Sequence, residues 1–74
     1  MNKQPLMMNV DAFREVVCAL GNQEKLAEAM GVTRAMLHYY QKNGLPVDRC
    51  IQMEQLSGVP RERLLPNLFR SDAA

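Results

Sequence analysis

The side chains of this sequence that are best suited to chemistry lie close together, in the stretch from residue 33 to residue 43. Arg34 and Lys42 carry positive charge there. His38 and Tyr39 add ring-borne hydrogen-bond donors, and no acidic residue interrupts the stretch. Groups of this kind bind phosphate oxygens and the acceptor atoms on base edges. The stretch therefore predicts non-covalent contact with a nucleic acid, although any one of these residues alone would be an ordinary solvated side chain.

Helical periodicity indicates which of these side chains are free to meet a partner. At about 100° of rotation per residue, Leu37 and Tyr40 fall on one side together with Thr33, and we expect that side to face the core. For Tyr39 one alternative stays open, namely packing against the following helix. The opposite side and its flanks carry the set that we expect to be exposed: Arg34, Ala35, His38, Tyr39 and Lys42.

Capping and turn signals define the helices that must position this face. Asn22 is a favourable N-cap for a helix over residues 23–30. Gly31 then supplies a turn at low steric cost. Thr33 caps the next helix, predicted over residues 34–42. Two short helices joined by a tight turn are typical of a helix-turn-helix.

The side chains around this turn satisfy the packing needs of a helix-turn-helix. The first helix needs a small residue where the second crosses it, and Ala27 stands there. Both helices also need inward apolar side chains. The predicted framework is Leu26, Ala27, Met30, Gly31, Val32, Leu37 and Tyr40.

Each exposed residue has an expected contact with DNA. Arg34 could pair with the O6 and N7 atoms of guanine, which contributes about 1–3 kcal/mol of discrimination. Ala35 leaves room for a thymine methyl group, while His38 and Tyr39 reach base edges. Phosphate contacts are expected from the remaining members of the set: Gln23, Thr33, Lys42 and Asn43.

Three further short helices are predicted outside this unit. The first spans residues 11–20, where apolar residues recur at three- and four-residue spacing. Proline and glycine residues delimit the other two, at 47–57 and 60–65. No segment alternates as a strand would. The fold class is therefore all-α, a compact bundle of five short helices. The expected organisation is a flexible arm at 1–8, one domain at 9–69 and a flexible tail at 70–74.

Composition narrows the class of protein. A chain of 74 residues encloses one core, and its 47% apolar and 23% charged residues are typical of a globular domain. The net charge of +1 is not that of a strongly basic protein. We find no membrane span or signal peptide and expect a cytoplasmic, nucleoid-associated protein. Cys18 is expected to be exposed and Cys50 to pack inward.

The same survey argues against an enzyme. The two cysteines and one histidine lack metal-ligand spacing, so no metal and no cofactor is expected. The acidic residues are dispersed, and no glycine-rich phosphate loop is present.

A family resemblance supports this interpretation. The segment 21–33, GNQEKLAEAMGVT, resembles the λ-repressor-like helix-turn-helix proteins of Cro/CI type. The segments 45–54 and 64–69 look like those of the prophage-encoded Cro-like group that includes the YdaS antitoxin family. The chain departs from the group's pattern at Tyr40, where Trp is common, and at Leu65 and Asn67, where Arg and Asp are usual. The resemblance implies a λ repressor-like DNA-binding domain.

The departures at residues 65 and 67 leave a surplus of apolar residues near the end of the chain: Leu64, Leu65, Leu68 and Phe69. They either seal the core against the first and fourth helices or join two subunits. A homodimer would match a palindromic operator with half-sites about 34 Å apart.

The leading hypothesis is thus a sequence-specific DNA-binding transcriptional regulator, either a Cro-like repressor or an antitoxin-type autorepressor. The alternative is an interaction module that neutralises a toxin partner, with DNA binding secondary.

Overall fold

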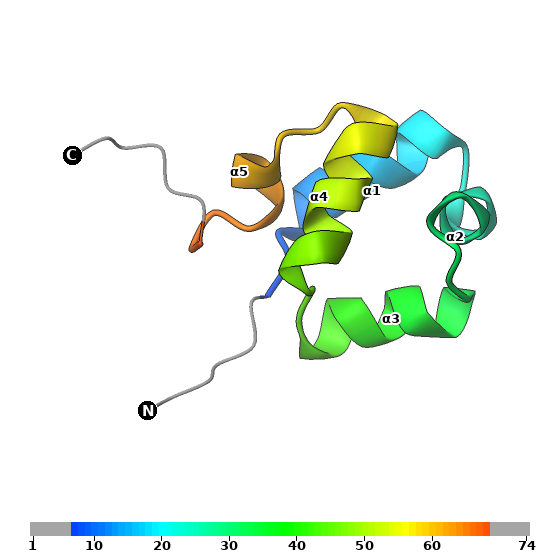
Figure 1. The fold of residues 1–74 in the computed structure, drawn as a ribbon, viewed down its shortest axis with the longest axis horizontal. Coiled ribbons are helices and arrows are strands. Elements are labelled where there is room, and N and C mark those ends of the chain that lie inside the picture. Colours follow the sequence, from blue (N-terminus) through cyan, green and yellow to red (C-terminus); the bar gives the residue numbers. More distant parts are fainter. Residues whose placement is uncertain (1–6, 69–74) are drawn as a thin grey trace.

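Five helices account for most of the chain in the computed structural model, which describes residues 7–68 (Figure 1). No strand occurs within those residues. The prediction of a compact all-α bundle is confirmed. The helices are α1 (Val10–Leu20), α2 (Gln23–Met30), α3 (Arg34–Asn43), α4 (Val47–Ser57) and α5 (Arg61–Leu64).

Polar caps begin the first three helices. The side-chain oxygen of Asn9 accepts from the amide of Ala12 at 2.9 Å, and that of Asn22 accepts from the amide of Lys25 at 2.8 Å. These bonds satisfy amides that the helix itself leaves without partners. Asn9 is therefore the N-cap of α1. The predicted bounds of α2 and α4 are confirmed, and α5 is shorter than predicted.

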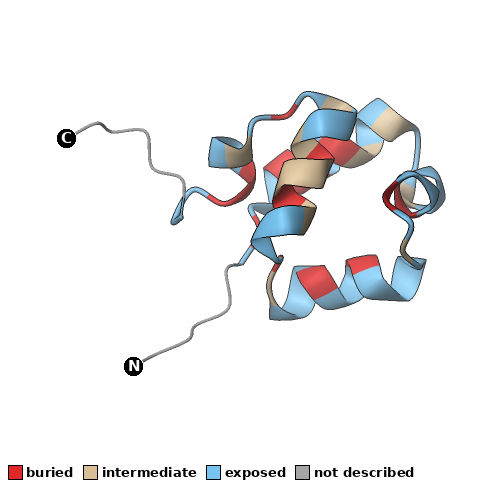
Figure 2. Cartoon of the chain, in the orientation of Figure 1, coloured by how far each residue is buried: buried red, intermediate tan, exposed pale blue. Residues whose placement is uncertain are grey.

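The core lies where α1 and α4 cross, with α2, α3 and α5 packed around them (Figures 1 and 2). Its largest fully enclosed side chains are aliphatic or sulfur-containing, which agrees with a sequence that has no Trp. They are Leu26, Leu37, Leu45, Met53, Leu64, Leu65, Val16 and Cys50.

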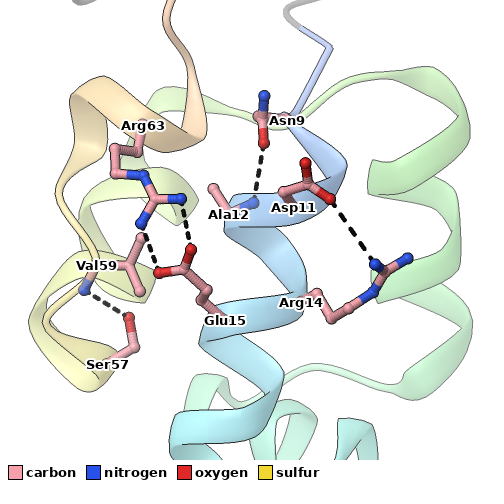
Figure 3. Close-up of polar contacts among 8 residues, drawn as sticks. All are labelled: Asn9, Asp11, Ala12, Arg14, Glu15, Ser57, Val59 and Arg63. Atoms are coloured by element: carbon pink, nitrogen blue, oxygen red, sulfur yellow. Dashed lines mark hydrogen bonds and ion pairs between the residues drawn. The ribbon is translucent and has the colours of Figure 1, made fainter.

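Helix α5 is held by ion pairs as well as by its apolar side chains. The Arg63 guanidinium donates two hydrogen bonds to the Glu15 carboxylate on α1 (Figure 3). Arg61 donates from Nε to the Glu54 carboxylate on α4 at 2.7 Å. In addition, the Asn9 amide donates to the Leu64 carbonyl oxygen at 2.9 Å. A helix of four residues has no stability of its own, so these contacts fix its place.

The apolar residues near the end of the chain were expected either to seal the core or to join two subunits. Leu64 and Leu65 are buried, and α5 packs against α1 and α4, so these two residues seal the core. Leu68 is exposed. Phe69 lies outside the described residues.

Three buried residues outside the helices were not among those expected in the core. Met8, which the sequence places at the end of the arm, is buried, as are Leu45 and Val59 in connecting segments. No periodic pattern includes an isolated apolar residue in a loop, so only the packing of the helices reveals its burial.

Candidate nucleic-acid interface

Helices α2 and α3 are joined by a turn that depends on glycine. Gly31 ends α2 in the left-handed region, with φ 75° and ψ 26°. Its amide donates to the carbonyl oxygens of Ala27 and Glu28, and the next amide, of Val32, donates to Ala27 at 2.9 Å. A Cβ atom at Gly31 would meet nothing within 4 Å. The backbone conformation, rather than lack of space, therefore favours glycine here.

The two helices cross, with their apolar faces turned toward the core. Figure 1 views α2 nearly along its axis while α3 lies across the picture. Leu37 and Tyr40 of α3 are buried and belong to the same core cluster as the apolar residues of α2, while Val32 packs against that cluster. Gly31 is exposed at the turn. The remaining framework residues are buried: Leu26, Ala27 and Met30.

The outer side of α3 is open along its length, and its two buried positions face the rest of the molecule (Figure 2). Tyr39 is 56% exposed, and its ring meets that of Tyr40 edge-on with centroids 6.4 Å apart. The Tyr39 side chain is thus open to a partner rather than buried against α4. The other predicted contact residues on this helix are also exposed: Arg34, Ala35, His38, Lys42 and Asn43.

Thr33 does not face the core, contrary to the prediction from helical phase. It is exposed, and its backbone is extended, with φ −95° and ψ 164°. Its hydroxyl oxygen accepts a hydrogen bond from the Met36 amide at 3.1 Å. A residue at the N-cap is not yet helical, so the rotation of 100° per residue does not apply to it. The hydroxyl proton stays available for a phosphate oxygen.

Gln23 stands at the beginning of α2 and beside α3. It is half-buried and lines a surface hollow of about 180 Å³ that also includes Arg14 and Gln41. The Gln41 amide donates to the Leu37 carbonyl oxygen at 3.4 Å. The hollow therefore gathers side chains from α1, α2 and α3 that can donate hydrogen bonds next to the positive end of α2.

Two side chains at this surface were missed by sequence reasoning. Met36 is 40% exposed and adds apolar surface to α3. Its helical phase lies at the border of the two faces, a signal that could have found it. Arg14 on α1 carries a positive charge to the hollow and pairs with Asp11 at 3.7 Å (Figure 3). Only the packing of α1 against α2 brings it there.

The charge on this surface is divided between the helices. The described surface of α3 carries no carboxylate, whereas Glu24 and Glu28 are exposed on α2. An anionic partner is thus attracted by α3 and the positive N-terminal end of α2, and repelled by the outer side of α2. Such an arrangement orients a partner without giving strong non-specific attraction.

The described residues include no group of three or more His, Cys, Asp or Glu side chains that could hold a metal ion. No helix among them is long and apolar enough to cross a membrane.

The two cysteines are placed as predicted, with Cys18 exposed and Cys50 buried. Burial, together with the charge of the neighbouring Glu54 carboxylate, raises the pKa of the Cys50 thiol to about 11. The thiol therefore stays protonated near neutral pH.

The fold and this surface define a small all-α protein whose α2–α3 pair has the form of a helix-turn-helix. The chain belongs to the family described as bacterial toxin YdaS, whose family model matches residues 13–72. Gene 30 protein of Enterobacteria phage phi80 is 41% identical over 51 residues, which are 66% of this chain and 70% of the phage protein. No solved structure matches the chain. The predicted YdaS-like grouping is confirmed, although the family's description names a toxin rather than an antitoxin.

Proposed function

We propose that the protein is a sequence-specific DNA-binding regulator of transcription of phage type, with α3 in the major groove of double-stranded DNA. The observation that carries this proposal is the exposed face of α3, which combines positive charge, ring donors and the small residue Ala35 without a carboxylate. An α-helix fits the width of the major groove, where each base pair presents a distinct set of acceptors and donors.

The position of each side chain on α3 assigns its role. Arg34 at the beginning of the helix reaches a guanine edge, and Ala35 beside it allows close approach to a thymine methyl group. His38 and Tyr39, one turn further on, reach the next base pairs. Gln23 and the exposed Thr33 hydroxyl bind phosphate on one flank, and Lys42 and Asn43 bind it on the other.

The small net charge of +1 makes a second subunit part of the proposal. Non-specific affinity comes mainly from phosphate neutralisation, which is modest in this protein. We therefore propose that the protein binds a palindromic operator as a homodimer that is weak in solution and stronger on DNA. Sedimentation at micromolar concentration is expected to show a monomer–dimer equilibrium, and a monomer with a single-half-site footprint would contradict the dimer.

Selection of bound sequences from a random DNA pool tests the proposal directly. The expected result is an enriched motif with two-fold symmetry. Replacement of Arg34, His38 and Lys42 together by alanine is expected to abolish enrichment, whereas Gln55→Ala on the exposed side of α4 is a matched control that leaves it unchanged. Enrichment that survives the triple replacement would exclude α3 as the recognition helix.

A second candidate is pairing within a toxin–antitoxin system, which the family's description favours. In that case an exposed surface of this domain binds a partner protein, and DNA binding is secondary. Co-expression with the product of the neighbouring gene distinguishes the two. A stable complex together with no enriched DNA motif would favour the second candidate.

A further inference from the structure

The carbonyl oxygen of Met30, at the end of α2, accepts hydrogen bonds from two side chains of α4. Gln52 donates from Nε2 at 3.2 Å, and Arg49 donates from Nη1 at 3.4 Å. The same Arg49 nitrogen donates to Oε1 of Gln52 at 2.8 Å. The bond from Arg49 orients the side-chain amide of Gln52, and that amide in turn donates to the Met30 carbonyl oxygen. Arg49, Gln52 and this carbonyl group therefore form one connected unit, which we call the α4 clamp.

The clamp supplies hydrogen-bond donors and a positive charge to the C-terminal end of α2. The last carbonyl groups of a helix have no partners within it, and the C-terminal end carries partial negative charge. α2 has no basic residue in its last turn. Arg49 brings a guanidinium to that end from another helix, and both Arg49 and Gln52 are half-buried. Hydrogen bonds to charged donors in such surroundings contribute more than those between neutral groups.

The clamped atom lies immediately before the turn that aims α3. Gly31 and Val32 follow Met30, and α3 is capped by Thr33. Among the helices, α2 is the one against which α3 packs most extensively, whereas α2 itself packs against α1 and α4. The orientation of α3 relative to the body of the protein is therefore transmitted through the end of α2.

We infer that Arg49 and Gln52 are positioning residues for the recognition helix. They hold the end of α2 on α4 and so preset the angle at which α3 meets DNA. This inference rests on the proposed function for its effect on DNA. Its effect on the free protein does not depend on DNA binding.

The decisive measurement is hydrogen exchange of backbone amides in the free protein. Gln52→Met keeps the shape of the side chain and removes both its donor and its acceptor. The expected result is exchange at least tenfold faster at residues 31–37 and unchanged exchange in the centres of α1 and α4. Gln55→Met, on the exposed side of α4, is the matched control and is expected to change neither. Unchanged exchange at residues 31–37 in Gln52→Met would overturn the inference.

A second pair of variants separates positioning from general stability. Gln52→Glu keeps an acceptor for Arg49 but loses the donor to Met30 and places a negative charge at the end of α2. It is expected to accelerate exchange in the turn as Gln52→Met does. Arg49→Lys keeps a positive donor and is expected to restore most of the protection that Arg49→Met loses. If Arg49→Met instead raises exchange uniformly over all helices, the residue serves global stability and the inference fails for it.

Operator affinity provides the functional readout. Gln52→Met is expected to weaken binding of the selected DNA sequence about tenfold, the factor that accompanies loss of about one hydrogen bond of this strength. Unchanged affinity together with a loosened turn would contradict the role in presetting α3. If the wild-type protein selects no DNA at all, the proposed function fails, while hydrogen exchange still decides whether the clamp holds α2.

Discussion

Arg34 and Lys42 lie at opposite ends of the exposed side of α3 and are expected to serve a partner differently. Arg34→Ala removes the proposed guanine contact and is expected to relax specificity at one base pair by about 1–3 kcal/mol. Lys42→Ala removes a phosphate contact, so it should weaken all sequences alike and reduce the slope of log affinity against log salt by about 1. Binding titrations over a series of salt concentrations and single-base operator variants check both. A loss of base preference in Lys42→Ala would reverse these assignments.

The two thiols are expected to differ in their reactivity toward a labelling reagent. Cys18 is exposed, whereas Cys50 is buried and its pKa is raised to about 11. Since the thiolate is the reactive form, iodoacetamide at pH 8 is expected to label Cys18 and to spare Cys50 in the folded protein. In denaturant both are expected to react. Mass spectrometry after digestion identifies the labelled residue, and rapid labelling of Cys50 in the native protein would contradict its burial.

At the scale of single helices, the N-cap side chains determine where α1, α2 and α3 begin. Asn22→Ala removes the acceptor for the Lys25 amide and is expected to lower the free energy of unfolding by about 1 kcal/mol. Urea denaturation measures this change. Asn22→Asp keeps an acceptor and is expected to retain most of the stability, and Gln55→Ala on exposed α4 is expected to stay within about 0.5 kcal/mol of the wild type. Equal losses in all three variants would argue against the cap.

At the scale of the whole molecule, the pair of Glu15 and Arg63 links α1 to α5 across the sequence (Figure 3). The hydrogen bonds from Arg63 hold the pKa of the Glu15 carboxyl below its ordinary value of 4.5. Because the folded-state pKa is the lower one, the pair stabilises the fold above pH 4.5, and this contribution is lost as the pH falls through the folded-state value. Both side chains are about half exposed, so the effect is small and weakened by salt.

Carboxyl NMR titration tests this link. Glu15 is expected to titrate below its ordinary value in the wild type and to return toward it in Arg63→Gln. Arg14→Gln removes a neighbouring guanidinium that pairs with Asp11 instead, and is expected to leave the Glu15 midpoint unchanged. A Glu15 midpoint that does not move in Arg63→Gln would show that the pair is not maintained in solution.

Local signals were sufficient for the helices and for the outline of the candidate interface. An N-cap acts on amides two or three residues away, and a left-handed glycine ends a helix where it stands. The N-caps Asn22 and Thr33 and the helix end at Gly58 could therefore be predicted from the sequence alone. The division of α3 into an inner side with Leu37 and Tyr40 and an outer side with the charged and ring-bearing residues follows from helical rotation, which is also local.

Only the tertiary structure decided which residues distant in the sequence contact one another. Arg49 and Gln52 lie 19 and 22 residues from Met30, and Arg63 lies 48 residues from Glu15. Contacts over such separations leave no periodic pattern, because they depend on how the helices pack rather than on the chain between them. The sequence therefore determined the helices and the composition of the exposed face of α3. Packing determined the clamp at the end of α2, the burial of Met8 and Leu45, and the attachment of α5.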